Sequence, residues 1–214
     1  MLEILYEDNH LLVAYKERGM LSQADGSNAV DMLSSLKQYI KEKYQKPGNV
    51  YLGLVHRLDR NTAGVMVFAR TSKAAARLSE QIRKHQFEKW YQAIVEGTLK
   101  GKGTLHHYLE KNEQERKSYV ASTGEEAILE YQVIKNLEIS TTPVTLVEIH
   151  LKTGRFHQIR AQFSAIGHPL YGDRKYGSLQ TVAPEEFPLE AFHLGFFHPI
   201  TGKWLCFEKK LIKE

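Results

Sequence analysis

The sequence predicts an α+β fold with a largely antiparallel sheet. Strand-like segments outnumber helix-like segments, and they follow one another in runs instead of alternating strictly with helices. Strict alternation would favour a parallel sheet, whereas runs of strands favour antiparallel pairing. With 214 residues, the chain is long enough to bury a sizeable core.

The first part of the chain predicts short strands and two helices. Residues 2–14 alternate unevenly between apolar and polar side chains around a turn-prone EDN, which indicates one or two strands. Residues 28–44 have apolar side chains at helical spacing and predict an amphipathic helix before the break PGN. Residues 65–69 are typical of a buried strand, and Thr71 or Ser72 can cap the helix that follows.

The second part predicts more strands and one further helix. Residues 89–99 (KWYQAIVEGTL) predict a strand that has Tyr91 on its apolar face. Residues 127–134 and 144–151 are two further strand candidates. Residues 155–167 (RFHQIRAQFSAIG) have an apolar stripe at helical spacing and predict a helix introduced by a glycine.

The C-terminal part predicts a hairpin and carries the only cysteine. Residues 193–208 (HLGFFHPITGKWLCFE) predict two strands around a PITGK turn. Cys206 lies in an apolar stretch, which predicts a buried thiol, and it cannot form an internal disulfide. Because the sequence also lacks a secretory signal and a run of roughly 20 apolar residues, we expect a cytoplasmic protein.

Charge and motifs restrict the function. The net charge of +4 and the pI near 9.0 favour a polyanionic partner only weakly. The sequence contains no phosphate-binding P-loop, no dinucleotide-binding glycine motif, no HExxH, no zinc-type Cys/His spacing and no GxSxG elbow. It therefore predicts neither a metal nor a nucleotide cofactor.

Residues 56–64 (HRLDRNTAG) contain the first candidate for chemistry. Asp59 stands between Arg57 and Arg60, and opposite charges within ~4–6 Å keep a carboxylate ionised. Asp59 could act as a nucleophile or a base, although on spacing alone half of an ion pair is the commoner role. Gly64 allows an unusual backbone geometry at this turn.

Two further segments are rich in polar side chains. In residues 151–160 (LKTGRFHQIR), Arg155, His157 and Arg160 on the first turns of a helix would form an anion-binding surface, and a solvated basic face is equally compatible. Residues 167–176 (GHPLYGDRKY) predict a loop, for which a plain structural turn is the default interpretation.

Taken in order, these stretches resemble the RluA-type pseudouridine synthase family, over nearly the whole chain. HRLDRNTAG resembles the family's catalytic signature HRLDxxTSG, and KWYQAIVEG resembles its KxYxAxVxG strand. LKTGRFHQIR and GHPLYGDRKY resemble LxTGRxHQIR and GHPLxGDxxY, while residues 4–23 (ILYEDNHLLVAYKERGMLSQ) and 198–203 (HPITGK) resemble its opening segment and terminal turn. Two positions depart from the pattern: Ala63 replaces a serine, and Glu17 replaces a proline after Lys16.

The resemblance implies a fold and a domain organisation. The expected fold is the family's catalytic domain, a long mixed, mainly antiparallel sheet flanked by helices and loops, with the active-site cleft across its middle. Residues 1–214 are expected to form this single domain. Because the opening segment begins at residue 4, we expect no N-terminal S4 RNA-binding domain.

The resemblance also implies an activity. The chain is expected to be an isomerase, an intramolecular transferase that converts specific uridines of ribosomal or transfer RNA to pseudouridine. The base leaves C1′, rotates and rejoins through C5, so no redox cofactor, nucleotide or metal is needed. The expected partner is RNA, with a stem-loop uridine that leaves its stack to react. We expect no membrane or small-molecule partner, and a monomer.

Site residues follow from the same matches. Asp59 corresponds to the catalytic carboxylate, Arg160 to the arginine that pairs with it, and Tyr91 to the tyrosine that packs against the target base. Substrate binding is assigned to four further side chains: His56, Arg57, Arg155 and His157.

Two alternatives belong to other functional classes. An RNA-binding protein could have kept the fold and lost catalysis, although the joint presence of Asp59, Tyr91 and Arg160 argues against this. A phosphodiesterase could use a basic cleft, and it would then require a metal or release phosphate. An isomerisation assay on unmodified RNA separates the synthase from both alternatives, and a metal requirement or released phosphate would identify the phosphodiesterase.

Overall fold

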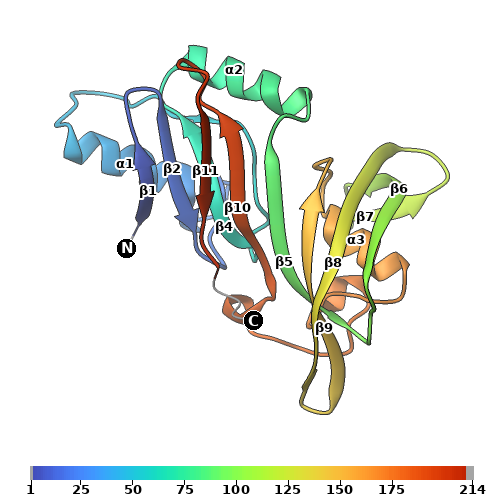
Figure 1. Cartoon of the computed structure of the whole chain (residues 1–214). Coiled ribbons are helices and arrows are strands. Elements are labelled where there is room, and N and C mark those ends of the chain that lie inside the picture. Colours follow the sequence, from blue (N-terminus) through green and yellow to red (C-terminus); the bar gives the residue numbers. More distant parts are fainter. Residues whose placement is uncertain (1, 211–214) are drawn as a thin grey trace. The chain divides into compact units, whose positions relative to one another are not determined.

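The computed structural model describes residues 2–210, and contacts divide this part of the chain into two compact units. The first unit runs to Phe87 and includes Phe192–Lys209; the second comprises Glu88–Ala191 and Lys210. Strand β10 (Leu189–Phe197) begins in the second unit and ends in the first. Figure 1 labels the elements, and each unit is described below by itself.

The first unit contains a sheet that begins with a tight hairpin. Its strand order is β1-β2-β4-β10, with β3 against β4 and β11 against β10. Asp8 closes the hairpin, because its Oδ1 accepts from the backbone N–H groups of His10 and Leu11, both at 2.7 Å. The predicted strands around EDN are therefore confirmed. The bounds are β1 (Glu3–Glu7), β2 (Leu11–Lys16), β3 (Gly53–Leu54), β4 (Ala63–Ala69) and β11 (Trp204–Glu208).

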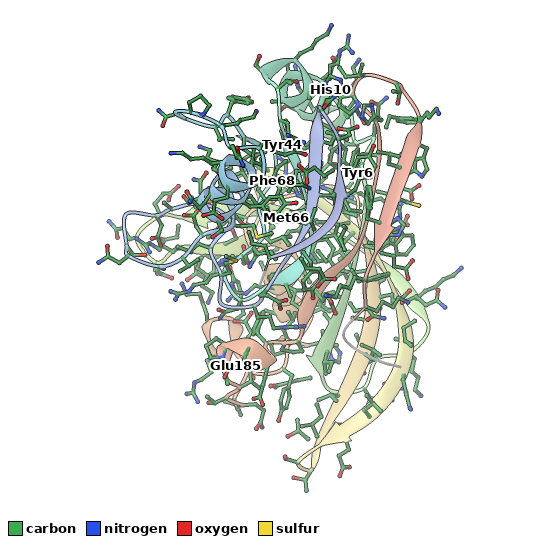
Figure 2. All side chains as sticks on the ribbon, turned by 90° about the vertical axis from the view of Figure 1, so that its left-hand side faces the viewer. Tyr6, His10, Tyr44, Met66, Phe68 and Glu185 are labelled. Carbon is green, nitrogen blue, oxygen red and sulfur yellow. The ribbon has the colours of Figure 1, made fainter. Side chains whose placement is uncertain are left out.

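Every residue of β4 is buried, so both faces of this strand are covered. Val67 shares an apolar cluster with Leu78 of helix α2 (Ser72–Arg83), which Thr71 caps as predicted. Met66 and Phe68, which Figure 2 labels, alternate to the other face of β4 and are fully buried. Helix α1 (Met32–Lys43) buries Met32, Leu36 and Ile40. The predicted start of α1 at residue 28 is wrong, since the Asp31 side chain accepts from the Ser34 N–H and caps the helix there.

The second unit contains five strands in the order β5-β9-β8-β6-β7, each antiparallel to its neighbour. Strands β8 and β9 form a long hairpin, which is clear in Figure 1. The sequence did not predict β6 and β7, because β6 (KGTLHHYLEKN) buries only Leu105 and Leu109 and lacks an apolar alternation. The bounds are β5 (Glu88–Glu96), β6 (Lys102–Asn112), β7 (Lys117–Ala121), β8 (Glu125–Ile139) and β9 (Thr142–Leu151).

Helix α3 (Gln158–Ala165) packs on the second sheet and is shorter than predicted. The expected start at residue 155 is wrong, because His157 has a left-handed backbone with φ of 52°. The side-chain amide of Gln162 donates to the carbonyls of Leu105 and Ala127, which fastens the helix to β6 and β8. Two short 3-10 turns follow, Arg174–Tyr176 and Pro184–Glu186.

Two remaining expectations concern surface and environment. The prediction that Cys206 is buried is wrong: alternation along β11 turns Cys206 outward, while Leu205 and Phe207 on either side are half-buried. Within residues 2–210, no helix is both long and apolar enough to cross a membrane. The expected single catalytic domain stays a prediction.

Candidate active site

Asp59 lies in the first unit, on a turn that leads into β4. The carbonyl of Asp59 accepts from the Thr62 N–H at 3.0 Å and so closes the turn. Just before it, the Ser22 hydroxyl donates to the Leu58 carbonyl at 2.7 Å and accepts from the Leu58 N–H at 3.1 Å. The backbone on both sides of this half-buried carboxylate is thus held in place.

Lys16 supports the same turn from the end of β2. Its side chain has no exposed surface, and its Nζ donates to the carbonyls of Glu17, Met20 and Arg60 at 3.2, 2.7 and 3.0 Å. Burial lowers the pKa of Lys16 to about 7, and the negative charge of Asp59 opposes that shift. Lys16 therefore both fixes the turn and places an amine in the electrostatic field of Asp59.

The neighbouring cations have different surroundings. Arg60 is exposed, and its Nε donates to the Gly19 carbonyl at 3.0 Å while its own carbonyl accepts from the Gly19 N–H at 2.9 Å. Arg57 is exposed. His56 is half-buried against Phe87, and its Nε2 accepts from the Val67 N–H at 3.0 Å. Because Nε2 accepts, the neutral ring carries its proton on Nδ1.

The departure at Ala63 has a packing explanation. Ala63 has no exposed surface and belongs to the apolar cluster between β4 and α2. The adjacent Thr62 already has a buried hydroxyl without a hydrogen-bond partner among the described residues. A second hydroxyl here would have to be buried among apolar side chains. The departure at Glu17 leaves an exposed side chain in a loop that Lys16 holds.

Tyr91 lies in the second unit, on the face of β5 that the sequence predicted. It is 8% exposed and stands opposite Ile149 of β9. Trp90 points to the other face, where it stacks on His150 with ring centroids 4.3 Å apart. Lys89 shares the face of Tyr91, because alternate residues of a strand point the same way.

Arg160 of α3 forms a two-point ion pair with Asp173. Its Nε donates to Oδ2 at 2.7 Å and its Nη2 to Oδ1 at 2.9 Å, and Asp173 is 3% exposed. The guanidinium also lies over the rings of Tyr176 and Phe187, at 4.9 and 5.6 Å. Asp173 comes from the segment that the sequence interpreted as a plain turn. The only signal for it was the GDxxY pattern.

His157 is a neutral link between Arg160 and Tyr176. Arg160 Nη1 lies 3.0 Å from Nε2, and the Tyr176 hydroxyl lies 3.0 Å from Nδ1. An arginine can only donate, so Nε2 accepts and Nδ1 carries the proton. Burial, helped by the charge of Arg160, lowers the pKa of His157 to about 3. At neutral pH, His157 orients its neighbours without adding a charge.

The anion-binding surface predicted from Arg155, His157 and Arg160 does not form on the first turns of a helix. Arg155 precedes α3, and its Nε and Nη1 donate to the carbonyl of Glu126 and the carboxylate of Glu125, at 2.8 and 2.9 Å. His157 is neutral, and Arg160 faces the Asp173 carboxylate. The assignment of His56, Arg57, Arg155 and His157 to substrate binding stays a prediction.

Two groups of the predicted site residues thus stand out. Asp59, His56 and Arg57 lie together in the first unit, with Lys16 and Ser22 as unpredicted supports. His157 and Arg160 lie together in the second unit, with Asp173 as an unpredicted support. Among residues 2–210, no cluster of three or more His, Cys, Asp or Glu side chains could hold a metal.

Comparison with known proteins decides the family. Residues 10–165 match the family model described as RNA pseudouridylate synthase, and this range includes Asp59, Tyr91 and Arg160. The chain belongs to the RNA pseudouridylate synthase family. As a member, it is an isomerase that acts on uridine in RNA.

Relatives agree along the whole chain. An RNA pseudouridine synthase of Aquifex aeolicus is 36% identical and covers 97% of this chain and 68% of its own length. The ribosomal large subunit pseudouridine synthase D of Zymomonas mobilis is 35% identical, and the match covers 100% of this chain and 70% of that protein. The dual-specificity RNA pseudouridine synthase RluA of Haemophilus influenzae is 34% identical, and the match covers 98% of this chain and 93% of that protein.

The fold agrees as well. The human RNA pseudouridylate synthase domain containing 1 has a TM-score of 0.75 over 98% of this chain and 83% of that chain, at 22% identity. The human RNA pseudouridylate synthase domain containing 4 has a TM-score of 0.74 over 99% of this chain and 89% of that chain, at 24% identity. The α+β pseudouridine synthase fold expected from the sequence is therefore confirmed.

Proposed function

We propose that this pseudouridine synthase modifies specific uridines of ribosomal or transfer RNA in the cytoplasm, as a monomer, with Asp59 as its catalytic carboxylate. One observation carries the assignment of Asp59. It is a half-buried carboxylate on a turn whose backbone is fixed by Ser22, Arg60 and the fully buried Lys16. Two relatives, a ribosomal large subunit synthase and a dual-specificity RNA synthase, support ribosomal or transfer RNA as the substrate class.

The chemistry requires such a group. Isomerisation breaks the C1′–N1 bond, turns the uracil and forms a C1′–C5 bond, while C5 loses a proton and N1 gains one. Attack on C1′, attack on C6 and removal of a ribose proton all use an ionised carboxylate close to the nucleotide. The nearby amine of Lys16 favours the ionised form of Asp59 when that amine carries its proton.

The second unit would supply the groups that hold the base and move protons. Tyr91 offers a largely buried ring that suits stacking on uracil, and its hydroxyl can take part in proton transfer at C5. Arg160 is held by Asp173 and His157, so it is a cation in a fixed position. Its pairing with Asp59 stays a prediction.

RNA binding would depend on the basic side chains. A stem-loop uridine must leave its stack, which costs a few kcal/mol. Contacts from Arg57 and other cations to phosphates offset that cost and should weaken with added salt. His56, which is fixed against β4 by its bond to the Val67 N–H, would be a further substrate-binding side chain.

The test uses purified protein and unmodified total ribosomal and transfer RNA, with a chelator and no added metal. We expect pseudouridine at discrete sites, no product with Asp59→Ala or Asp59→Asn, and full activity with Asp25→Asn, which removes the same charge from an exposed loop. If the wild-type chain binds these RNAs and forms no pseudouridine, an RNA-binding protein without catalysis is the better description. Mapping the modified positions identifies the substrate.

A further inference from the structure

Within residues 2–210, Lys89 differs from Lys16 and Arg160 because none of these residues accepts a hydrogen bond from its amine. The buried amine of Lys16 donates to three carbonyls, and Arg160 faces the carboxylate of Asp173. Lys89 is also partly enclosed, on β5, yet no described residue forms a hydrogen bond or an ion pair with it. Two acids near the start of β8 are engaged elsewhere: Glu125 with Arg155 and Glu126 with His106.

The surroundings of Lys89 disfavour the charged form of its amine as long as no anion is bound. Its Nζ lies at the turn that carries Gly154, where an added Cβ would stand only 3.2 Å from the amine. The next residue, Arg155, is a second cation. Desolvation, followed by the charge of Arg155, lowers the pKa of Lys89. An anion that approached this site would favour the charged form of Lys89, because it would offset both the desolvation and the repulsion from Arg155.

The position of Lys89 indicates which anion. Lys89 and Tyr91 point to the same face of β5 and are two residues apart, about 7 Å along the strand. This distance is within the span of one nucleotide. If Tyr91 packs against the target uracil, as the proposed function has it, a phosphate next to that uridine would lie in reach of Lys89.

We infer that Lys89 binds an RNA backbone phosphate adjacent to the target uridine, and that the turn formed by Thr153, Gly154 and Arg155 shapes this phosphate subsite. The inference rests on the proposed function for the identity of the RNA. It assigns to Lys89 the phosphate contact that the sequence had suggested for Arg155, His157 and Arg160. A lysine suits this role as a compact point charge with three donors.

The experiment compares Lys89→Met with Lys84→Met, which removes the same charge from an exposed ion pair with Glu80 on α2. Binding is measured in the Asp59→Asn background, on unmodified total transfer RNA and a transcript of large-subunit ribosomal RNA, over a series of salt concentrations. KM and kcat are measured on the same RNAs with Asp59 intact. For Lys89→Met we expect the slope of log K against log salt to become shallower by about 0.7–0.9, and KM to rise about tenfold with kcat within about twofold. Lys84→Met should change neither.

A thermal melt in the absence of RNA separates binding from a structural role. Because Lys89 has no described partner, Lys89→Met should melt at the same temperature as the wild type or higher. A lower melting temperature with an unchanged salt slope would overturn the inference in favour of a structural role. An unchanged slope with a lower kcat would overturn it in favour of a contact to the base.

The same samples distinguish this inference from the proposed function. Wild-type protein is first assayed for pseudouridine on both RNAs. No product from the wild type would count against the proposed function itself. Product from the wild type, together with equal slopes for Lys89→Met and Lys84→Met, would count against the phosphate contact alone.

Discussion

The amine of Lys16 donates to the backbone carbonyl of Arg60 at 3.0 Å, one residue beyond Asp59. This bond joins the end of β2 to the turn that carries the proposed catalytic carboxylate. Two further bonds, to the carbonyls of Glu17 and Met20, extend the same support to the following loop. A single buried side chain therefore fixes the geometry of the turn and contributes to the field at Asp59.

Replacing Lys16 by Met should reduce both stability and activity. The variant leaves three carbonyls without their donor, and we expect a loss of about 2–4 kcal/mol in the free energy of unfolding. Activity should fall at least about tenfold even where the variant is fully folded, because a small displacement of a catalytic group is costly. Denaturant titration and pseudouridine assays at 20 °C would measure the two effects.

Lys100→Met, at an exposed position, is the control for Lys16→Met. It should differ from the wild type by no more than about 0.5 kcal/mol in the free energy of unfolding. Full activity in a folded Lys16→Met variant would show that Asp59 does not depend on this support.

Replacing Asp173 by Asn should weaken the site of the second unit. The neutral amide removes the carboxylate that Arg160 binds at two points, and breaking a buried ion pair typically costs about 3–5 kcal/mol. We expect lower stability by roughly that amount and a clear fall in kcat/KM. Calorimetry and assays under matched folded conditions would check it, with exposed Glu185→Gln as the control for a removed charge. Wild-type stability in Asp173→Asn would contradict the proposed importance of this ion pair.

The strongly periodic elements of the fold could be predicted from the sequence. Strand β5, with Tyr91 on its apolar face, and helix α2, with its Thr71 cap, form as expected because their apolar spacing and capping are local signals. Strands β6 and β7 could not be predicted. Their pairing depends on β8 and on α3, which are distant in sequence, and not on an apolar alternation of their own.

The site shows the same division. Asp59, Tyr91 and Arg160 could be singled out because each stands in a recognisable motif. Lys16 and Asp173 could not be assigned a role, since a lysine at a strand end and an aspartate in a loop are ordinary in sequence. Only their contacts, across 44 and 13 residues of chain, show which groups they support.

Replacing Ala63 by Ser should restore the serine of the family pattern at the expense of stability. The new hydroxyl would be buried in the apolar cluster with Val65 and Leu78, which we expect to cost about 1–2 kcal/mol. Activity should remain, because Ala63 forms no part of the proposed catalysis. Thermal melts would test this against Ala76→Ser on the exposed face of α2, and equal melting temperatures would contradict the packing explanation.

His157 should make the protein sensitive to acid. Its pKa is about 3 in the folded chain and 6.5 without the fold, so the unfolded chain binds a proton first as the pH falls. The contribution of His157 to the free energy of unfolding is therefore fully present above pH 6.5. It is lost as the pH falls from 6.5 to 3, by at most about 1.4 kcal/mol per pH unit. His157→Gln removes this titration and should lose less stability over the same range. Unfolding titrations at pH 7, 6 and 5 would measure the difference, with exposed His85→Gln as the control. Parallel pH dependence of the wild type and His157→Gln would show that the ring is not kept neutral by its burial beside Arg160.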